Sequence, residues 1–377
     1  MHILIFTAFY LPGYKGGGPI RTISNMVSNL GDEFDFSIYT SDRDLGDITH
    51  YPSITPNIWQ KQKKTNVFFA SPKYRTAYDL WEIISNFKGE VIYLNSFFSF
   101  RFSILPLILQ KIKNNKKVVI IAPRGEFSNG ALRIKSFKKR FYINLINLLG
   151  LYKGIVWHAS TEHEASDIRR SIGNDAKIKL ALNISLTGDN KISYPIKGTP
   201  LRVVFASRIS PMKNLLGAID ILKRTESDIL FHVYGPSENE IYWKTCLLET
   251  KKLPNNVKFE YMGHLKPNDV INKLAEYDLF ILPTFGENFG HIISEALSAG
   301  LPLLISDTTP WRNLLKKGIG WDVPLENPGK FAEHIEECCK KNSMEYLTWR
   351  KSIRAWAIEN IGQNKTIEQN KNLFINF

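Results

Sequence analysis

Short apolar runs rich in β-branched residues alternate with longer amphipathic runs along almost the whole chain. This alternation is typical of parallel sheets covered by helices, because strands buried on both faces read as near-continuous apolar segments. It occurs on both sides of a polar segment at 184–200 that contains two prolines and two glycines. We therefore expect an α/β protein with two doubly wound, Rossmann-like domains. The expected strands are 2–8, 34–39, 66–70, 90–95, 117–122 and 155–159, then 201–206, 229–234, 256–261, 278–282 and 301–305.

The length of 377 residues exceeds what one hydrophobic core usually supports, which also favours two domains. We place the first domain at 1–185, a linker at 186–200 and the second domain at 201–355. A C-terminal helix at 356–377 is expected to return to the first domain. The carboxyl ends of both sets of strands should face a cleft, where ligands of such folds bind. Helices are expected near 20–30, 77–87, 102–113, 131–150 and 162–171, then 213–223, 238–250, 267–276 and 289–299.

Composition narrows the kind of protein further. A formal net charge of +13 suits an anionic partner: nucleic acid, a membrane surface or a phosphorylated substrate. Three cysteines, Cys246, Cys338 and Cys339, are too few for a disulfide framework and predict reduced thiols. The N-terminus has no basic segment before its apolar run, and no apolar run is long enough to span a bilayer. We expect a cytoplasmic protein.

The first motif that carries chemistry follows the first expected strand. Gly16, Gly17, Gly18 and Pro19 precede an amphipathic helix. Consecutive glycines let backbone N–H groups approach an anion, and the helix N-terminus adds positive potential. Gly17 and Gly18 are therefore candidates for a phosphate-binding loop. The alternative is a flexible loop in which the glycines serve only chain reversal.

The second motif lies at 205–214, FASRISPMKN, just after the first strand of the second domain. Arg208 would offer a forked guanidinium and Lys213 a compact charge at the carboxyl end of that strand. This pair predicts a clamp for a diphosphate. Basic residues at loop tips are more often simply solvated, and that alternative stays open.

The third motif is PTFGENFGHIISEALSAGLPLL at 283–304. Glu287 lies in a turn flanked by glycines, and Glu295 follows two turns into the expected helix. Glu295 could accept from both hydroxyls of a ribose, and Glu287 from the hydroxyls of a sugar. The backbone N–H groups of Asn288, Phe289 and Gly290 could meet a phosphate at the helix N-terminus. The alternative is a pair of exposed capping glutamates.

These motifs, with VYGPSEN (233–239), YMGHLKPNDV (261–270) and APRGEFSNGAL (122–132), resemble the retaining GT-B glycosyltransferases of family four, the glycosyl transferases group 1. The resemblance covers nearly the whole chain. It implies two Rossmann-like domains facing a cleft, with the acceptor bound by the first and the nucleotide sugar by the second. It also implies hexosyl transfer with retention, in the synthesis of O-antigen, lipopolysaccharide or capsule.

The resemblance assigns roles to individual residues. Arg208 and Lys213 match the residues that neutralise the donor diphosphate, Glu295 the acid on the ribose, and Glu287 the acid facing the sugar. Gly17 and Gly18 match the phosphate loop of the first domain. Gly263, His264 and Leu265 match the segment whose backbone flanks the base. Asn288, Phe289 and Gly290 match the backbone beside the sugar and phosphates.

The first domain departs from the family pattern. Many relatives carry a histidine where this chain has Arg124, and an H-x-H pattern where it has Asn95-Ser96. Arg124 is therefore a catalytic candidate and Glu126 a candidate for polar work at the acceptor. The sequence offers no covalent nucleophile that we can name.

The implied mechanism is electrostatic. Arg208, Lys213 and helix dipoles would stabilise the nucleoside diphosphate leaving group, and we expect no metal or cofactor besides the donor. The donor would carry a hexose or N-acetylhexosamine, on UDP in the first place and with GDP-mannose next. The tripeptide Asp42-Arg43-Asp44 looks like a metal-binding motif but is interpreted as a solvated turn.

The segment 131–153 is rich in Lys and Arg and has no acidic residue. Its apolar residues Ile134, Phe137, Phe141, Leu145 and Leu148 recur at helical spacing. A basic amphipathic helix of this kind suits an anionic membrane surface, with an ordinary packed helix as the alternative. We expect peripheral contact with the inner face of the cytoplasmic membrane, through the residues Lys138, Lys139 and Arg140.

Two other functions remain as alternatives. A GT-B sugar-nucleotide epimerase would use a similar cleft but needs carboxylates and histidine in the first domain. A basic nucleic-acid-binding protein would need a recognition helix or an aromatic sheet platform, and the sequence shows neither, so we expect no nucleic-acid partner. The expected partners are a nucleotide sugar and a glycan or lipid-linked acceptor.

Overall fold

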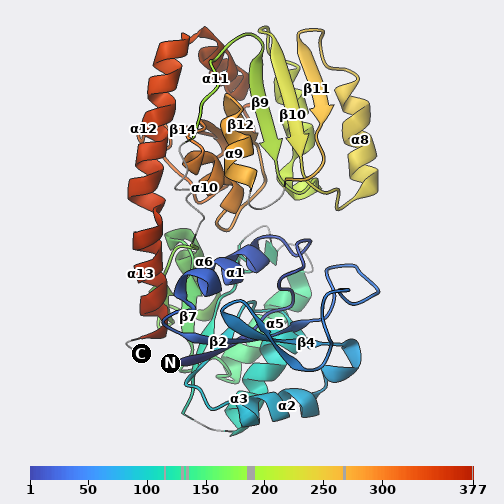
Figure 1. Cartoon of the computed structure of the whole chain (residues 1–377), viewed down its shortest axis with the longest axis vertical. Coiled ribbons are helices and arrows are strands. Elements are labelled where there is room, and N and C mark those ends of the chain that lie inside the picture. Colours follow the sequence, from blue (N-terminus) through green and yellow to red (C-terminus); the bar gives the residue numbers. More distant parts are fainter. Residues whose placement is uncertain (114–115, 129–130, 133–135, 185–191, 266–268, 376) are drawn as a thin grey trace. The chain divides into compact units, whose positions relative to one another are not determined.

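The computed structural model describes residues 1–113, 116–128, 131–132, 136–184, 192–265, 269–375 and 377 (Figure 1). The chain divides into two compact units. The first comprises Met1–Ile184 together with Asn364–Phe377, and the second comprises Ser185–Gln363. Within the described residues, no helix combines the length and the apolar character needed to cross a membrane.

The described residues of the first unit form an eight-stranded sheet in the order β3-β4-β2-β1-β5-β6-β7-β8. All neighbouring strands are parallel except β3 and β4. The strand order reverses between β1 and β5, which makes their carboxyl ends the topological switch point of this sheet. The strands are β1 (His2–Phe6), β2 (Asp35–Ser41), β3 (Trp59–Gln62), β4 (Thr65–Ala70), β5 (Val91–Leu94), β6 (Val118–Ile121), β7 (Val156–Ala159) and β8 (Lys177–Leu180).

Helices bury both faces of this sheet, as its apolar strands require. In β1, Leu4 and Phe6 join a core with α2, α3, α5 and α6, while Ile3 and Ile5 join a core with α1 and α13. Phe374 of α13 packs its ring against Phe34, Phe36 and Tyr93, and so places the C-terminal helix in this unit. The helices are α1 (Gly18–Leu30), α2 (Ala77–Asn86), α3 (Leu105–Lys113), α5 (Ser136–Leu148), α6 (Glu162–Ile172) and α13 (Gln363–Phe374).

The described residues of the second unit form a six-stranded, fully parallel sheet in the order β11-β10-β9-β12-β13-β14. This is the doubly wound order, and its switch point lies between β9 and β12. The strands are β9 (Leu201–Ala206), β10 (Ile229–Tyr234), β11 (Val257–Tyr261), β12 (Leu279–Leu282), β13 (Leu303–Ser306) and β14 (Gly320–Val323). The helices are α7 (Leu215–Leu222), α8 (Glu240–Thr250), α9 (Val270–Ala275), α10 (His291–Ser298), α11 (Pro328–Lys340) and α12 (Ser343–Ile361).

The predicted α/β fold with two Rossmann-like parallel sheets is confirmed, and each of the eleven expected strands has its counterpart. Three strands of the described residues were not predicted: β3, β8 and β14. The first two, WQKQ and KIKL, lie at the two edges of the first sheet, where polar side chains remain in solvent. The third, GWDV, contains a glycine and an aspartate, which are depleted in strands.

Candidate functional site

The predicted donor residues of the second unit gather at the carboxyl ends of β9 and β12. Arg208 and Lys213 follow β9, and the segment Pro283–Gly290 follows β12. These two strands are neighbours in the sheet and flank its switch point. The carboxyl edge at a switch point is where open α/β sheets bind ligands.

Hydrogen bonds tie the two loops together. Asn214 adopts a left-handed conformation (φ 57°) and donates from its side-chain amide to the Pro283 carbonyl at 2.8 Å. The carbonyl of Met212 accepts from the hydroxyl of Thr284 and from the backbone N–H of Phe285, both at 2.9 Å. The left-handed residue ends the short helical turn Pro211–Lys213 and begins α7. Lys213 is therefore held beside the loop that carries Glu287.

Lys213 and Glu287 form an ion pair, with Nζ 2.5 Å from Oε1. Only 10% of the Lys213 side chain and 13% of the Glu287 side chain are exposed. Removing one partner of such a buried pair leaves the other charge uncompensated, which costs more than the pair itself contributes. Sequence reasoning gave the two residues separate roles, one on phosphate and one on sugar. In the structure, the Glu287 carboxylate orients the Lys213 ammonium at the switch point.

Arg208 is paired as well, with Glu238 in the loop after β10. The Arg208 and Glu238 side chains are 40% and 31% exposed, so solvent weakens their attraction. Such a pair leaves the guanidinium able to exchange its partner for a phosphate. Sequence reasoning missed Glu238. The sequence indicates Glu238 only through its position, because it follows β10, and β10 lies next to β9 in the sheet.

The start of α10 is fixed by Gly290, which has a φ of 77°. A Cβ atom there would lie 2.9 Å from Cδ1 of Ile293, the end of a side chain that can move, so the cost of a side chain would be mainly backbone strain. The Phe289 carbonyl accepts from the indole N–H of Trp311 at 2.5 Å, which holds the segment that precedes the helix. Asn288 is half-buried beside it, and Glu295 is 7% exposed on α10.

The segment Gly263–Leu265 follows β11, two strands from β9. The Gly263 carbonyl accepts from the N–H of Gly235 at 2.8 Å, which joins the loops after β10 and β11. His264 is exposed, while Gly263 and Leu265 are half-buried. All predicted donor residues of this unit thus follow the carboxyl ends of β9, β11 and β12.

In the first unit, Gly17 begins α1 with a φ of 71°. The preceding turn is held by Asp44, whose Oδ2 accepts from the backbone N–H groups of Tyr14 and Lys15 at 2.7 and 3.0 Å. The expectation of a solvated turn at 42–44 is therefore wrong. Asp42 and Asp44 are 1% and 4% exposed. The Asp44 carboxylate thus already binds two backbone N–H groups of the glycine-rich loop.

Arg124 lies in the turn after β6 and is held by three neutral acceptors. Its Nε donates to Asn95 Oδ1 at 2.7 Å, and its terminal nitrogens donate to Asn183 Oδ1 at 2.8 Å and Tyr93 Oη at 2.6 Å. The Tyr93 hydroxyl lies 2.6 Å from Nδ1 of His158. Burial, reinforced by the charge of Arg124, lowers the pKa of His158 to about 3. The imidazole is therefore neutral, and sequence reasoning did not find it.

Glu126 has a local structural task. Its carboxylate accepts from the N–H groups of Phe97 and Phe98, at 2.5 and 3.0 Å, and from the Ser96 hydroxyl at 3.0 Å. Burial raises the pKa of Glu126 above its usual value despite these bonds. The residue thus holds the loop that follows β5.

The basic helix α5 belongs to the first unit and buries Ile143 and Ile146 in its core. Lys138 is exposed, whereas Lys139 donates to the Ala131 carbonyl at 2.7 Å and lies over the Phe98 ring. Phe141 is 62% exposed. The side chains of Arg140, Ile134, Phe137, Leu145 and Leu148 lie outside the described residues.

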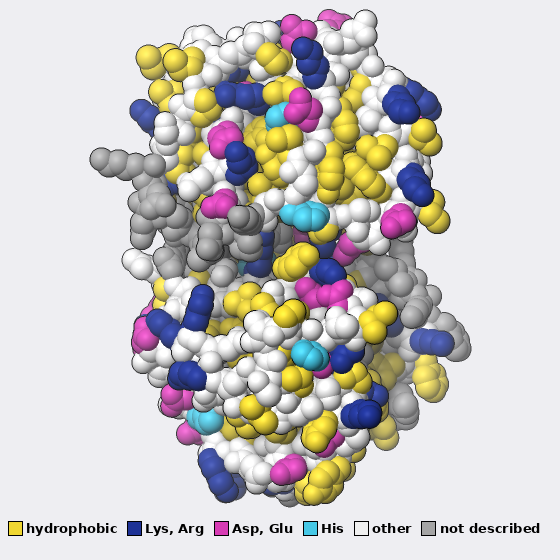
Figure 2. Space-filling model, turned by 45° about the vertical axis from the view of Figure 1, so that its right-hand side comes forward, with side chains coloured by type: hydrophobic (Ala, Val, Ile, Leu, Met, Phe, Trp, Pro, Cys, Tyr) yellow, Lys and Arg dark blue, Asp and Glu magenta, His cyan; other side chains and the backbone are white. Residues whose placement is uncertain are grey.

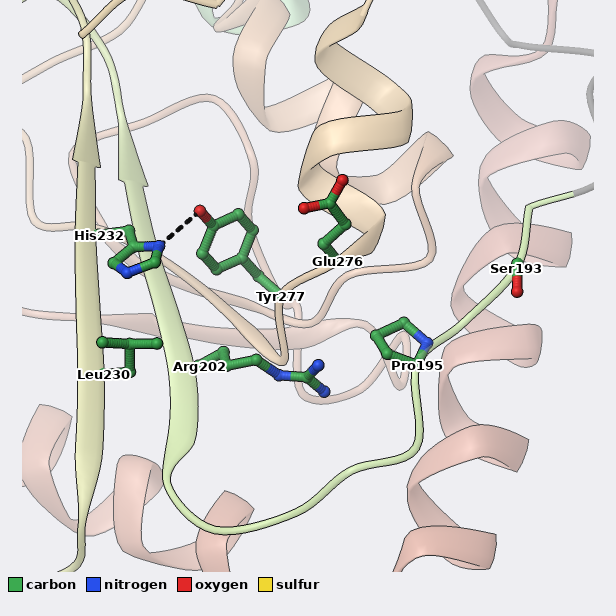
Figure 3. A pocket seen from close by; sticks show the side chains of 7 residues that line it. All are labelled: Ser193, Pro195, Arg202, Leu230, His232, Glu276 and Tyr277. Atoms are coloured by element: carbon green, nitrogen blue, oxygen red, sulfur yellow. Dashed lines mark hydrogen bonds between the residues drawn. The ribbon is translucent and has the colours of Figure 1, made fainter. Parts of the chain in front are cut away.

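A separate hollow of about 440 Å³ lies in the second unit (Figure 3). Arg202, at the amino end of β9, binds both oxygens of Asp278 at 2.8 Å. His232 Nδ1 lies 2.8 Å from the Tyr277 hydroxyl. None of the predicted site residues lines this hollow, and we assign it no part in the site. Its lining residues are Ser193, Pro195, Arg202, Leu230, His232, Glu276 and Tyr277.

The surface charge also bears on the partner. On the face that Figure 2 shows, Lys and Arg side chains are scattered among Asp and Glu side chains. Among the described residues on this face, they form no continuous basic stripe of the kind that lines a nucleic-acid groove.

Comparison with known proteins identifies a family over most of the second unit. Residues 188–356 match the family of glycosyl transferases group 1. The chain is also 23% identical over 259 residues to an uncharacterized 41.2 kDa protein in the cps region of Klebsiella pneumoniae, covering 66% of this chain and 69% of that protein. The second unit therefore carries a group 1 glycosyl transferase domain, and the chain is a glycosyltransferase.

Solved structures share the fold over the whole length. Sucrose-phosphate synthase from Thermosynechococcus elongatus aligns with a TM-score of 0.75 at 13% identity, covering 99% of this chain and 98% of that chain. Anabaena HepE in complex with UDP-glucose aligns with a TM-score of 0.74 at 17% identity, covering 99% of both chains. WaaG, a glycosyltransferase involved in lipopolysaccharide biosynthesis, aligns with a TM-score of 0.64 at 14% identity, covering 98% of both. The fold is therefore the GT-B fold of glycosyltransferases.

Proposed function

We propose that this glycosyltransferase moves a hexose or N-acetylhexosamine, with retention of configuration, from a nucleotide diphosphate sugar to a glycan. A UDP-sugar is the favoured donor and GDP-mannose the second. The acceptor is a lipid-linked or polysaccharide glycan of the cell surface. The observation that carries the proposal is the buried Lys213–Glu287 pair at the switch point of a group 1 domain.

The charges at this edge suit the chemistry of the leaving group. A nucleoside diphosphate gains negative charge as the glycosidic bond breaks, and fixed positive groups stabilise that charge. Lys213 supplies a compact ammonium, and Arg208 a fork that fits two phosphate oxygens. In this proposal the diphosphate takes the place of Glu238 on Arg208. Glu287 meanwhile keeps Lys213 in position and meets the sugar hydroxyls.

Glu295 of α10 is assigned to the ribose of the donor. Replacing it with alanine should weaken donor binding by about 1.5–3 kcal/mol, because a charge-assisted acceptor for hydroxyl groups is lost. Isothermal titration of the donor measures the change. Glu276→Ala is the matched control, since Glu276 lies before β12, at the opposite end of the strand. Equal donor affinity in folded Glu295→Ala and wild type would remove Glu295 from the site.

The proposed donor and acceptor classes are supported by the names of similar proteins. UDP-glucose is bound by HepE, WaaG is named for lipopolysaccharide biosynthesis, and the Klebsiella relative is named for its place in the cps region. These names favour a UDP-sugar and a cell-surface glycan. In this proposal the first unit binds the acceptor. Gly17 and Gly18 are assigned to the donor phosphates, and Arg124 and Glu126 to the acceptor.

We further propose that α5 touches an anionic membrane. Lys138 and Phe141 are its exposed basic and aromatic side chains within the described part. Lys138→Ser should weaken binding to vesicles containing anionic lipid by about 1 kcal/mol, the usual contribution of one charge near such a surface. Sedimentation with vesicles at low salt measures it. Lys73→Ser, in the turn before α2, is the control. A wild type that ignores anionic vesicles would contradict this part of the proposal.

A further inference from the structure

Arg124 occupies a turn that the fold holds in an unusual backbone conformation. Its φ is 55°, which residues other than glycine rarely adopt. The turn is locked from α6, where Glu164 accepts from the N–H of Gly125 at 2.6 Å and from the N–H of Ser160 at 2.8 Å. A strained residue that its surroundings over-determine is typical of a functional position.

The guanidinium of Arg124 is oriented by a chain of neutral groups. Nε2 of His158 lies 2.9 Å from the Ala181 carbonyl, so that nitrogen carries the proton and Nδ1 accepts from the Tyr93 hydroxyl. The Tyr93 oxygen is then left to accept from Arg124. Asn95 and Asn183 accept from the other two nitrogens through their amide oxygens. The network fixes the position of the cation without neutralising it.

No carboxylate pairs with Arg124 within the described part of the chain. The two glutamates of this region hydrogen-bond to other groups. Glu164 accepts from Gly125 and Ser160, and Glu126 accepts from the loop after β5. By contrast, Arg75 and Arg170 of the same unit are paired with aspartates. Arg124 therefore presents a half-buried positive charge that forms no ion pair with a carboxylate of the described residues.

The remaining donors of Arg124 suit an anion with two oxygens. A guanidinium has five N–H groups, and the three bonds given above use one on each nitrogen. One N–H remains on each terminal nitrogen. A guanidinium with an N–H available on each terminal nitrogen can bind a carboxylate or phosphate in bidentate fashion.

We propose that Arg124 is the anion-recognition residue of the first unit and selects acceptors that carry a carboxylate or phosphate. It follows β6, beside β5 at the switch point of this sheet, where a ligand is expected. The acceptor role rests on the proposed glycosyl transfer, whereas the anion site itself stands on the contacts of Arg124. Its neighbours Asn95 and Asn183 are neutral, so no acidic side chain of the network repels the ligand.

Three glycosides that share one ring test this proposal: methyl α-D-glucopyranoside, its 6-phosphate, and the corresponding methyl glucuronide. The readout is the Nε–H signal of Arg124 in the full ¹⁵N-labelled chain, identified by its absence in Arg124→Lys. We expect a saturable shift with the glucuronide, the phosphate or both, and binding at least about tenfold tighter than that of the neutral glycoside. A response to the glucuronide alone assigns a uronic acid, and one to the phosphate alone a phosphorylated sugar.

Arg124→Lys keeps the charge but loses the fork, so backbone amide signals of Gly125 should report at least about tenfold weaker binding of the anion. Arg101→Lys, at an exposed position of the same unit, should bind as the wild type does. An Arg124 signal that no anion moves, or that the neutral glycoside moves equally, would overturn the proposal. Because the probes lack a nucleotide, Lys213→Ala should respond to them like the wild type. Failure of donor binding is thus distinct from failure of this site.

Discussion

Replacing Lys213 with alanine should lower kcat by about 10²–10³-fold, the usual effect of losing one donor that stabilises charge in the transition state. Lys213 is nearly buried and fixed by Glu287, so its field acts on the leaving group with little screening by water. The diphosphate gains charge as the bond to the sugar breaks. Donor affinity should therefore fall less than kcat. Release of nucleoside diphosphate under saturating donor and acceptor measures the rate.

The control must separate catalysis from folding, because Lys213→Ala leaves Glu287 as an unpaired and nearly buried acid. The double variant Lys213→Ala, Glu287→Gln removes that charge and should recover stability without recovering kcat. Lys223→Ala, which breaks a comparable pair with Glu249 in the same unit, should retain the wild-type rate. A folded Lys213→Ala enzyme with kcat within threefold of wild type would contradict the assigned role.

Among glycine-to-alanine substitutions in the loops of the candidate donor site, Gly235→Ala should lower the free energy of unfolding most. A Cβ on Gly235 would lie 1.8 Å from the carbonyl oxygen of Ser207, where the chain leaves β9 towards Arg208. Gly235 also has a φ of 137°, which side chains disfavour. Backbone strain of about 1–3 kcal/mol and overpacking of about 1–3 kcal/mol together predict a loss of about 2–6 kcal/mol. Urea denaturation measures the free energy of unfolding.

Gly263→Ala supplies the matched control. The two glycines are joined by one hydrogen bond, but a Cβ on Gly263 would meet no atom within 4 Å. Its φ of 75° leaves only the cost of a left-handed residue, about 1–2 kcal/mol. Equal stability of the two variants would show that the contact with Ser207 does not constrain the loop.

Much of the fold could be predicted from the sequence, because buried parallel strands carry a strong signal. Segments such as LRVVFA and ILFHVY are apolar except for Arg202 and His232, and they match β9 and β10. The polar edge strands β3 and β8 carry no such signal, since their position rather than their composition makes them strands. The packing of Phe374 among Phe34, Phe36 and Tyr93 depends on contacts between segments far apart in the chain.

The residues of the candidate site could be predicted from the sequence, but the ion pairs and hydrogen bonds between them could not. The Gly-flanked turn around Glu287 and the loop with Lys213 stand out as motifs, yet their ion pair arises only because β9 and β12 are neighbours. Glu238 reaches Arg208 for the same kind of reason. Asp44 was misjudged because a polar tripeptide looks solvated, and only the fold turns it onto the N–H groups of Tyr14 and Lys15.

The central claim is that this chain transfers a sugar from a nucleotide diphosphate donor with electrostatic help from Lys213 and Arg208. The most direct measurement incubates the full chain with UDP-, GDP- and dTDP-sugars and a pool of lipid-linked and polysaccharide glycans, in EDTA, and follows the anomeric proton by NMR. The account predicts that one donor is consumed only when glycan is present, and that the sugar appears in the product with the donor's anomeric configuration. Inverted product, consumption of a donor without glycan, or turnover that EDTA abolishes and Mn²⁺ restores would contradict it.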